Sequence, residues 1–365
     1  MILENAIQLV EYSGGWLAQE LVKAHSSRLR WDEHRQSWAA YDGAKWSRDY
    51  RVAFQLAAEI SRWANHRLVS GCTSEKELDR AGRLVRRIGS LRGMEEVLRL
   101  AKYDKSVAVD VVELDTNDDL LGTPDVVVDL RTGAVSSPEP DQMISLNTAV
   151  SPIPMPTPVW DKFLKDVTDG DEELSSFLKR MAGYALTGYA REQKAIFLWG
   201  PTCTGKNTFL GALSAVMGDY ARQAGGYMFY KTPARIRATD LGWVAGARLV
   251  RGAEVSRGKQ WGDAKIELMT GPSPLKGRRF YGKEFSYRPQ MLLVFCVNHK
   301  PRLTTARDRA LIVPFKHKLE VVNMWLPEQL KAEYPGILQW MIEGAQEWYR
   351  RGLDAPQVVR DEAVN

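Results

Sequence analysis

The chain has 365 residues, with 50 lysines and arginines against 45 aspartates and glutamates, which gives a formal net charge of +5. Hydrophobic residues make up 44% and charged residues 26%, a composition that excludes a disordered chain and suggests about two folded domains. The positive surplus is compatible with a phosphate-rich partner, but it is too small to argue for one.

The cysteine pattern excludes two common ways of holding a small fold together. Cys72, Cys203 and Cys296 are odd in number, far apart and free of C-x-x-C spacing. We therefore expect neither a disulfide framework nor a zinc site, and a reducing compartment fits. The start of the chain, Met1–Glu11, lacks the basic and apolar regions of a signal peptide. The longest apolar run, Met291–Val297, is too short for a membrane span, so we expect no membrane partner.

The first 50 residues predict a helix and then a β-hairpin. Residues 1–30 have a helical pattern, and aromatic residues flank an Asp42-Gly43 pair over residues 31–50, which is typical of a hairpin turn. The aromatics could stack on nucleic-acid bases, but a small aromatic core is the favoured interpretation. They are Trp31, Trp38, Tyr41, Trp46 and Tyr50.

Residues 50–103 have helical apolar spacing, and residues 107–135 turn strand-like. We assign residues 1–150 to an N-terminal, mostly helical domain with small β elements. Five arginines could form a phosphate-facing stripe, although a solvated helix face is the commoner explanation of such a run. They are Arg80, Arg83, Arg86, Arg87 and Arg92.

The domain boundary is expected at residues 151–158. This segment holds four prolines in eight residues, Ser-Pro-Ile-Pro-Met-Pro-Thr-Pro, so it predicts a stiff extended connector. Residues 159–320 then alternate apolar strands with helices, which predicts an α/β core with a parallel sheet. Residues 321–365 are expected to form a short helical C-terminal segment.

A phosphate-binding loop follows the apolar strand 195–199. Gly200 and Gly205 let backbone N–H groups surround a phosphate, Lys206 reaches the β and γ phosphates, and a helical pattern begins directly after it. We expect ATP along the whole loop, at Gly200, Pro201, Thr202, Cys203, Thr204, Gly205, Lys206, Asn207 and Thr208.

The loop departs by one residue from the usual pattern, because Asn207 and not a hydroxyl residue follows the lysine. Mg²⁺ prefers oxygen ligands, and an asparagine carbonyl can supply one. We expect the metal at Asn207, Thr208 and the carboxylate of Glu254.

Three further positions fit ATP hydrolysis. Glu254 ends a strand and is the candidate to orient water, and Asn298 ends the next apolar strand and could sense the γ-phosphate or cap the turn before Pro301. Arg309, or alternatively Arg307, precedes a strand and suits an arginine finger supplied to a neighbouring subunit.

Together these elements resemble the superfamily 3 helicases of the phage and plasmid primase–helicase family, related to the poxvirus helicase–primase. The resemblance runs from about Leu29 to Pro356. It rests on the phosphate loop together with Leu120–Gly133, Gly183-Tyr-Ala-Leu-Thr-Gly188, Gly218-Asp-Tyr220, Thr270-Gly271, Asn298-His-Lys-Pro301 and Pro314-Phe315.

The resemblance implies an AAA+-like ATPase core in which Glu254 is the Walker B acid, Asn298 the sensor and Arg309 the finger. It implies a DNA-gripping hairpin at Lys276, Arg278, Arg279 and Lys283, although charge alone would favour an exposed loop. Three positions depart from the family pattern: Gly271-Pro272-Ser273, Glu267 and Asp308. We find neither the primase–polymerase module nor the winged-helix domain that relatives often carry, so the chain is a compact motor or part of a longer protein.

We therefore expect an ATP-dependent replicative DNA helicase that forms a homo-hexameric ring on single-stranded or forked DNA. A primase or polymerase module in cis or trans is an expected partner, and the bacterial host cytoplasm the expected location. The resemblance implies travel from 3′ to 5′, which no residue here indicates. Three alternatives remain: a non-unwinding initiator or loader ATPase, a nucleotide-gated DNA-binding module and, more distantly, a small-molecule kinase.

Overall fold

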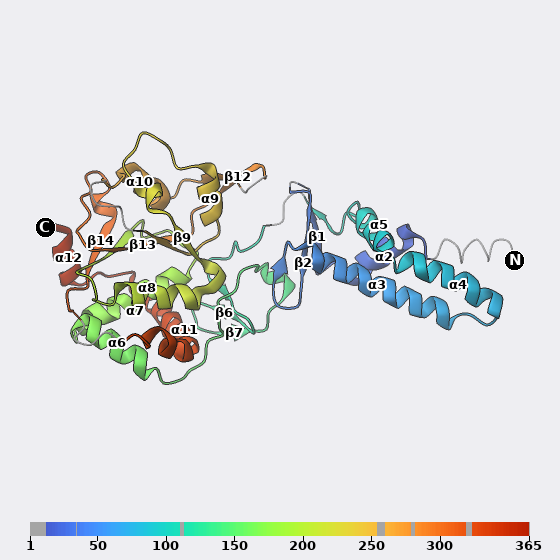
Figure 1. Ribbon diagram of the computed structural model, residues 1–365, viewed down its shortest axis with the longest axis horizontal. Helices are drawn as coiled ribbons and strands as arrows, with labels where there is room; N and C mark the ends of the chain where they lie inside the picture. The colour runs from blue at the N-terminus through green and yellow to red at the C-terminus, as the bar shows by residue number, and fades with distance from the viewer. Residues whose placement is uncertain are drawn as a thin grey trace. The chain divides into compact units, whose positions relative to one another are not determined.

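The computed structural model describes residues 12–33, 35–109, 113–253, 260–278, 282–318 and 323–364 (Figure 1). The chain forms two compact units: unit 1 is Met1–Leu114 with Pro138–Ser145, and unit 2 is Asp115–Ser137 with Leu146–Asn365. The chain therefore passes from one unit to the other at 114/115, 137/138 and 145/146. We expected a single boundary at the proline-rich segment, and the units divide elsewhere.

The described residues of unit 1 are mainly helical. Among the described residues of this unit, each of the four α-helices begins at a serine or aspartate whose side chain accepts a hydrogen bond from the first turn, which satisfies a backbone N–H that the helix leaves unpaired. The helices are α2 (Gly14–His25), α3 (Tyr50–Ser70), α4 (Glu75–Ile88) and α5 (Leu91–Ala101). The five arginines of the α4–α5 region are all exposed.

A small sheet with the order β3-β2-β1-β4 completes unit 1. The Asp42-Gly43 pair turns the chain between β2 and β3, with Gly43 at φ 111°. The four aromatic residues before Tyr50 are buried, so the prediction of a small aromatic core is confirmed for them, while Tyr50 is 48% exposed. The strands are β1 (Leu29–Asp32), β2 (Ser37–Tyr41), β3 (Trp46–Ser47) and β4 (Ala108–Val109).

Unit 2 contains the predicted parallel sheet, with five strands in the order β14-β8-β13-β10-β9. The strands β8, β13 and β14 are short apolar runs, as expected where a sheet is covered on both faces, whereas β9 and β10 each carry an arginine. They are β8 (Ala195–Trp199), β9 (Ala221–Ala224), β10 (Leu249–Gly252), β13 (Leu292–Val297) and β14 (Ala310–Pro314).

Helices cover both faces of this sheet (Figure 1). Ile196 and Leu198 of β8 pack into one buried cluster, and Ala195 and Phe197 into the other, as the alternation of side chains along a strand requires. The first cluster includes α6 (Pro158–Thr168), α7 (Glu172–Leu186), α8 (Lys206–Met217) and α11 (Leu326–Arg351). The second includes α9 (Ala238–Val244) and α10 (Asp263–Thr270). The result is a three-layered α/β unit.

The C-terminal helices belong to this core. Gly183 of α7 and Gly344 of α11 let the two backbones touch, because a Cβ on either would collide with the main chain of the other helix. The last helix, α12 (Gln357–Val364), packs beside β14. Within the described residues, no helix is both long and apolar enough to span a membrane.

Residues on both sides of the expected boundary pack into unit 2. A three-stranded sheet of β5 (Leu120–Gly122), β6 (Val127–Asp129) and β7 (Val135–Ser136) buries Leu121 and Val128 in the helical cluster. The proline-rich segment before Pro158 has no helix or strand, as predicted, and it lies along α11, where the Ile153 N–H donates to the Pro335 carbonyl at 3.2 Å. Proline content indicates a stiff segment, but it does not say which unit that segment packs on.

Candidate nucleotide-binding site

The predicted phosphate loop joins β8 to α8 at the carboxyl edge of the parallel sheet, where such sheets bind ligands. Its two glycines are required by their surroundings. Gly205 has φ 86°, and a Cβ there would lie 2.6 Å from Val167 Cγ1. A Cβ on Gly200 would collide with the Phe315 carbonyl. The strand–loop–helix order and the turn that the glycines make are therefore those expected of a phosphate loop.

Lys206 is held inside the loop. It is only 5% exposed, and its Nζ donates to the Gly200 carbonyl at 2.6 Å, to the Pro201 carbonyl and to Thr204 Oγ1 at 3.3 Å. The ammonium group thus sits among main-chain acceptors. To contact a bound phosphate, Lys206 Nζ would have to leave the Gly200 and Pro201 carbonyls. Cys203 is exposed on the same loop and has φ 62°.

The predicted metal ligands have a neighbour that sequence reasoning missed. Asn207 Oδ1 accepts a hydrogen bond from Arg251 Nη2 of β10 at 3.2 Å, so the amide oxygen faces a cation. A Mg²⁺ ion at Asn207 would require the amide to leave Arg251, whereas Thr208 is half-buried on the first turn of α8. Glu254 lies outside the described residues. Among the described residues, Thr208 could supply an oxygen atom to Mg²⁺, and so could Asn207 once its amide no longer accepts from Arg251.

Asn298 lies at the same edge of the sheet as the loop. β13 pairs with β8 in parallel, with Val297 opposite Trp199, and the Gly200 N–H donates to the Val297 carbonyl at 3.2 Å. Asn298 is the next residue and its side chain is exposed. The sheet therefore brings the candidate sensor and the phosphate loop together.

The candidate finger residues lie at the opposite edge. They form a short 3₁₀ helix, Arg307–Arg309, just before Ala310, which pairs with Ala195 at the start of β8. At about 3.3 Å per residue, the length of β8 separates this edge from the loop by roughly 13 Å. Arg307 is exposed, and Arg309 Nη1 donates to Thr270 Oγ1 at 3.3 Å. Neither arginine adjoins the loop of its own chain.

The predicted DNA hairpin is an antiparallel pair, β11 (Leu275–Arg278) and β12 (Glu284–Tyr287). Lys276 and Arg278 are exposed and alternate with buried Leu275 and Gly277, and Lys283 is exposed in the turn. Arg279 lies outside the described residues. The alternation places the two strand cations on one face of the hairpin.

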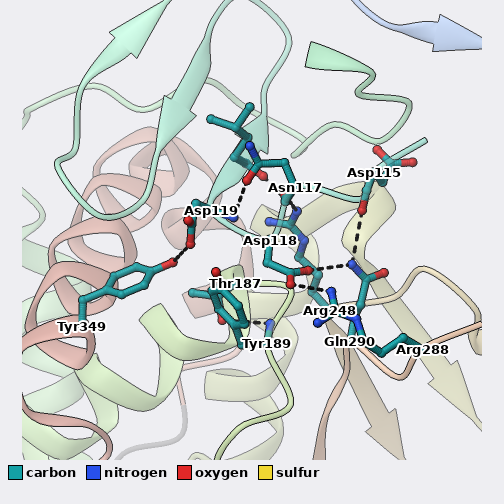
Figure 2. A network of polar contacts seen from close by, with 11 residues as sticks. Asp115, Asn117, Asp118, Asp119, Thr187, Tyr189, Arg248, Arg288, Gln290 and Tyr349 are labelled. Carbon is teal, nitrogen blue, oxygen red and sulfur yellow. Dashed lines mark hydrogen bonds and ion pairs between the residues drawn. The ribbon is translucent and has the colours of Figure 1, made fainter. Parts of the chain in front are cut away.

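A polar network behind the hairpin was not predicted, because its members are far apart in sequence (Figure 2). Asp118 accepts hydrogen bonds from Arg288, the residue after β12, and from Gln290 Nε2 at 2.9 Å. Arg248 is 2% exposed, and its guanidinium donates to the carbonyls of Leu186 at 2.6 Å and Leu120 at 2.8 Å. These contacts join residues 117–120 to the sheet and to the base of the hairpin.

Comparisons with known proteins agree with this architecture. Residues 18–169 match the family described as "D5 N terminal like", and no curated protein matches the chain. The chain is similar to the C-terminal region of NrS-1 (305–718) in its apo structure, with a TM-score of 0.53 and 10% identity over 96% of this chain and 71% of that one. A second apo structure of that region, in its A form, gives a TM-score of 0.53 and 11% identity, with 95% and 70% covered. At this identity the solved structures establish similarity of fold, and the match over residues 18–169 supports the resemblance to the primase–helicase family.

Proposed function

We propose that the protein is an ATP-hydrolysing DNA helicase of the phage and plasmid replication type. The observation that carries the proposal is the glycine-built loop between β8 and α8, with Asn298 beside it at the carboxyl edge of the sheet. The family match and the sequence motifs favour DNA replication over small-molecule phosphorylation. The exposed cations of the hairpin favour DNA as the partner.

In this proposal the loop N–H groups bind the phosphates of ATP, and Lys206 leaves the Gly200 and Pro201 carbonyls to contact the β and γ phosphates. Asn207, Thr208 and Glu254 would hold Mg²⁺, which neutralises phosphate charge when it is bound. Glu254 orients the attacking water and Asn298 senses the γ-phosphate.

The site would be completed by a second subunit. Arg309 and Arg307 lie at the far edge of the sheet from their own loop, so either one would act on the site of a neighbour. We infer a homo-hexameric ring with the hairpins around single-stranded or forked DNA. A primase or polymerase module, in cis or in trans, would act with it.

The decisive experiment measures phosphate release with and without single-stranded DNA, strand displacement on a forked duplex, and the mass of the particle. We expect DNA-stimulated turnover, unwinding and a hexamer. Turnover without unwinding would instead indicate an initiator or loader, and DNA binding without turnover a nucleotide-gated module.

Two variants separate binding from chemistry. Lys206→Ala should abolish turnover, because the main cation on the transferred phosphoryl group is lost. Glu254→Gln should bind ATP and DNA but not hydrolyse ATP, because its shape is kept and the carboxylate is removed. Lys165→Ala, at an exposed lysine of α6, is the control. Wild-type turnover in Lys206→Ala would remove the loop from the mechanism.

A further inference from the structure

Unit 1 contains a cavity of about 400 Å³ where β1 and β2 meet α5, a volume within the roughly 300–1,000 Å³ of small-molecule sites. Its lining residues all belong to unit 1, whereas the phosphate loop belongs to unit 2. The lining residues that matter here are Trp31, Trp38, Tyr50, Glu95, Arg99 and Lys102.

One part of the lining is aromatic. The Trp31 and Trp38 rings meet edge to face with their centroids 5.2 Å apart, and Tyr50 presents a ring that is 48% exposed. Trp31 Nε1 is buried and has no hydrogen-bond partner among the described residues. This nitrogen is not solvent-accessible, so a molecule in the cavity would contact the aromatic rings and not this N–H.

A second part of the lining is cationic. Lys102 Nζ lies 5.1 Å from the centre of the Trp31 ring, and Arg99 is exposed one turn of α5 away. Neither has an ion-pair partner within the part of the chain that the structure describes. Glu95 is the acidic residue of the lining. The pKa of the Tyr50 hydroxyl is raised, mainly because Tyr50 is partly buried and also because the negative charge of Glu95 is near. The Tyr50 hydroxyl therefore stays neutral at physiological pH and can donate a hydrogen bond.

We propose that this cavity binds one nucleotide unit, with the base against Tyr50 and the tryptophan edges and the phosphate between Arg99 and Lys102. An aromatic surface beside two cations suits this ligand, because bases stack on rings and phosphates attract lysine and arginine. The unit is either one residue of a single-stranded nucleic acid or a free nucleotide, since both carry a base and a phosphate.

The test uses the full chain with Lys276, Arg278 and Lys283 replaced by alanine, so that the hairpin no longer dominates binding. We expect Arg99→Ala with Lys102→Ala to weaken binding of a fluorescent oligothymidylate at least about tenfold. The log–log salt slope should fall by about 1.4, at about 0.7 for each lost contact. Glu95→Gln should strengthen binding, because it removes the acidic group that repels the phosphate.

Arg92→Ala is the matched control, because Arg92 is exposed on the same helix and does not line the cavity. An equal loss in Arg92→Ala and Arg99→Ala would overturn the proposal by showing a general charge effect. Arg99→Lys should restore most of the binding, and thermal melting of each variant checks that it is folded.

Photocrosslinking locates the ligand directly. An oligonucleotide carrying 5-bromodeoxyuridine should form an adduct on the peptide that contains Tyr50, and Tyr50→Ala should abolish that adduct. Competition by thymidine monophosphate at concentrations similar to those of the oligonucleotide would identify a free nucleotide as the ligand. Weak competition would identify a strand. Adducts found everywhere except at the cavity would overturn the proposal.

Discussion

Gly242 of α9 and Gly277 of β11 face each other so closely that a Cβ on Gly277 would lie 2.8 Å from Gly242 Cα. A Cβ on Gly242 would in turn collide with the main chain of Arg278. The Tyr287 hydroxyl of β12 adds a hydrogen bond to the Leu241 carbonyl at 2.7 Å. The hairpin is therefore held against α9 by backbone contact, and its position depends on two residues that carry no charge.

Gly242→Ala should push the hairpin off α9. We expect weaker single-strand binding and loss of DNA stimulation, while basal ATP turnover remains, because the phosphate loop is on another strand. Fluorescence anisotropy and phosphate release measure the two effects. Gly82→Ala is the control, since an added Cβ there meets nothing within 4 Å. It should raise stability by up to about 1 kcal/mol and leave DNA binding unchanged.

Replacing Lys276, Arg278 and Lys283 by alanine should weaken binding to all single-stranded sequences alike. Each lost phosphate contact removes about 0.7 from the log–log salt slope, so the triple variant should lose about 2. Titrations at several salt concentrations give the slope. A triple variant that keeps the wild-type slope would place the DNA path elsewhere, for example along the exposed arginines of α4.

Arg309→Ala should be inactive alone but regain turnover when it is mixed with Lys206→Ala, because one intact interface can form between unlike subunits. Phosphate release from mixed rings, with subunit exchange verified by mass, measures this recovery. The same experiment with Arg307→Ala chooses between the two arginines. Recovery in only one of the two mixtures identifies the finger. The two arginines differ in their surroundings, since Arg309 donates a hydrogen bond to Thr270 and Arg307 is more exposed.

A thiol-alkylating reagent should modify Cys203 before Cys72 or Cys296, because Cys203 alone of the three is exposed. The adduct would fill the space for phosphate and block turnover, and ATP with Mg²⁺ should protect the thiol. Cys203→Ser should stay active and resist the reagent. Peptide mass mapping follows the reaction, and faster labelling of Cys72, or no protection by nucleotide, would contradict a loop that is open to phosphate.

Glu362 of α12 should contribute stability that depends on pH. Its carboxylate pairs with Lys300 Nζ at 2.6 Å and with Lys316. Burial raises the pKa of Glu362, but the hydrogen bonds and charges of the two lysines outweigh it, and the folded-state pKa lies below its usual value. A lowered pKa stabilises the fold above the unfolded-state value of about 4.3, and this stability is lost as the pH falls through the folded-state pKa.

Glu362→Gln should therefore lower the free energy of unfolding by about 1–3 kcal/mol at pH 7, and the difference should shrink towards pH 3. Urea unfolding at both pH values measures it. Glu328→Gln, in the exposed pair with Lys331, should change stability by less than about 1 kcal/mol at either pH. Equal losses in the Glu362 variant at both pH values would assign its effect to packing and not to charge.

The parts of the fold that follow local rules could be predicted from the sequence. The apolar run before Gly200 and the helical spacing after Lys206 were enough to predict the strand–loop–helix order. The Asp42-Gly43 pair was enough to predict the turn between β2 and β3. The assignment of residues 115–137 to unit 2 could not be predicted, because it depends on contacts between residues remote in sequence: Leu121 and Val128 pack in the helical cluster, and Arg248 donates to the Leu120 carbonyl. A buried arginine that binds main-chain oxygens has no sequence signature.

The positions in the candidate site that follow from local sequence patterns could also be predicted. Gly200 and Asn298 each follow a predicted apolar strand, so knowledge of a parallel sheet was enough to place both at one edge. The contact of Arg251 with Asn207 was not predictable, because it requires knowing that a side chain of β10 reaches the first turn of α8.

The threefold passage of the chain between the units also has a mechanical consequence. Pro138–Ser145 belongs to unit 1, where the Trp46 N–H donates to the Ile144 carbonyl and Trp46 Nε1 to the Pro140 carbonyl, both at 2.7 Å. A protease cut after Leu114 would therefore leave the two fragments bound through this inserted segment. Separating these two fragments would require breaking the hydrogen bonds of Trp46 to Pro140 and Ile144, so the segment would act as a non-covalent clasp in the cut protein.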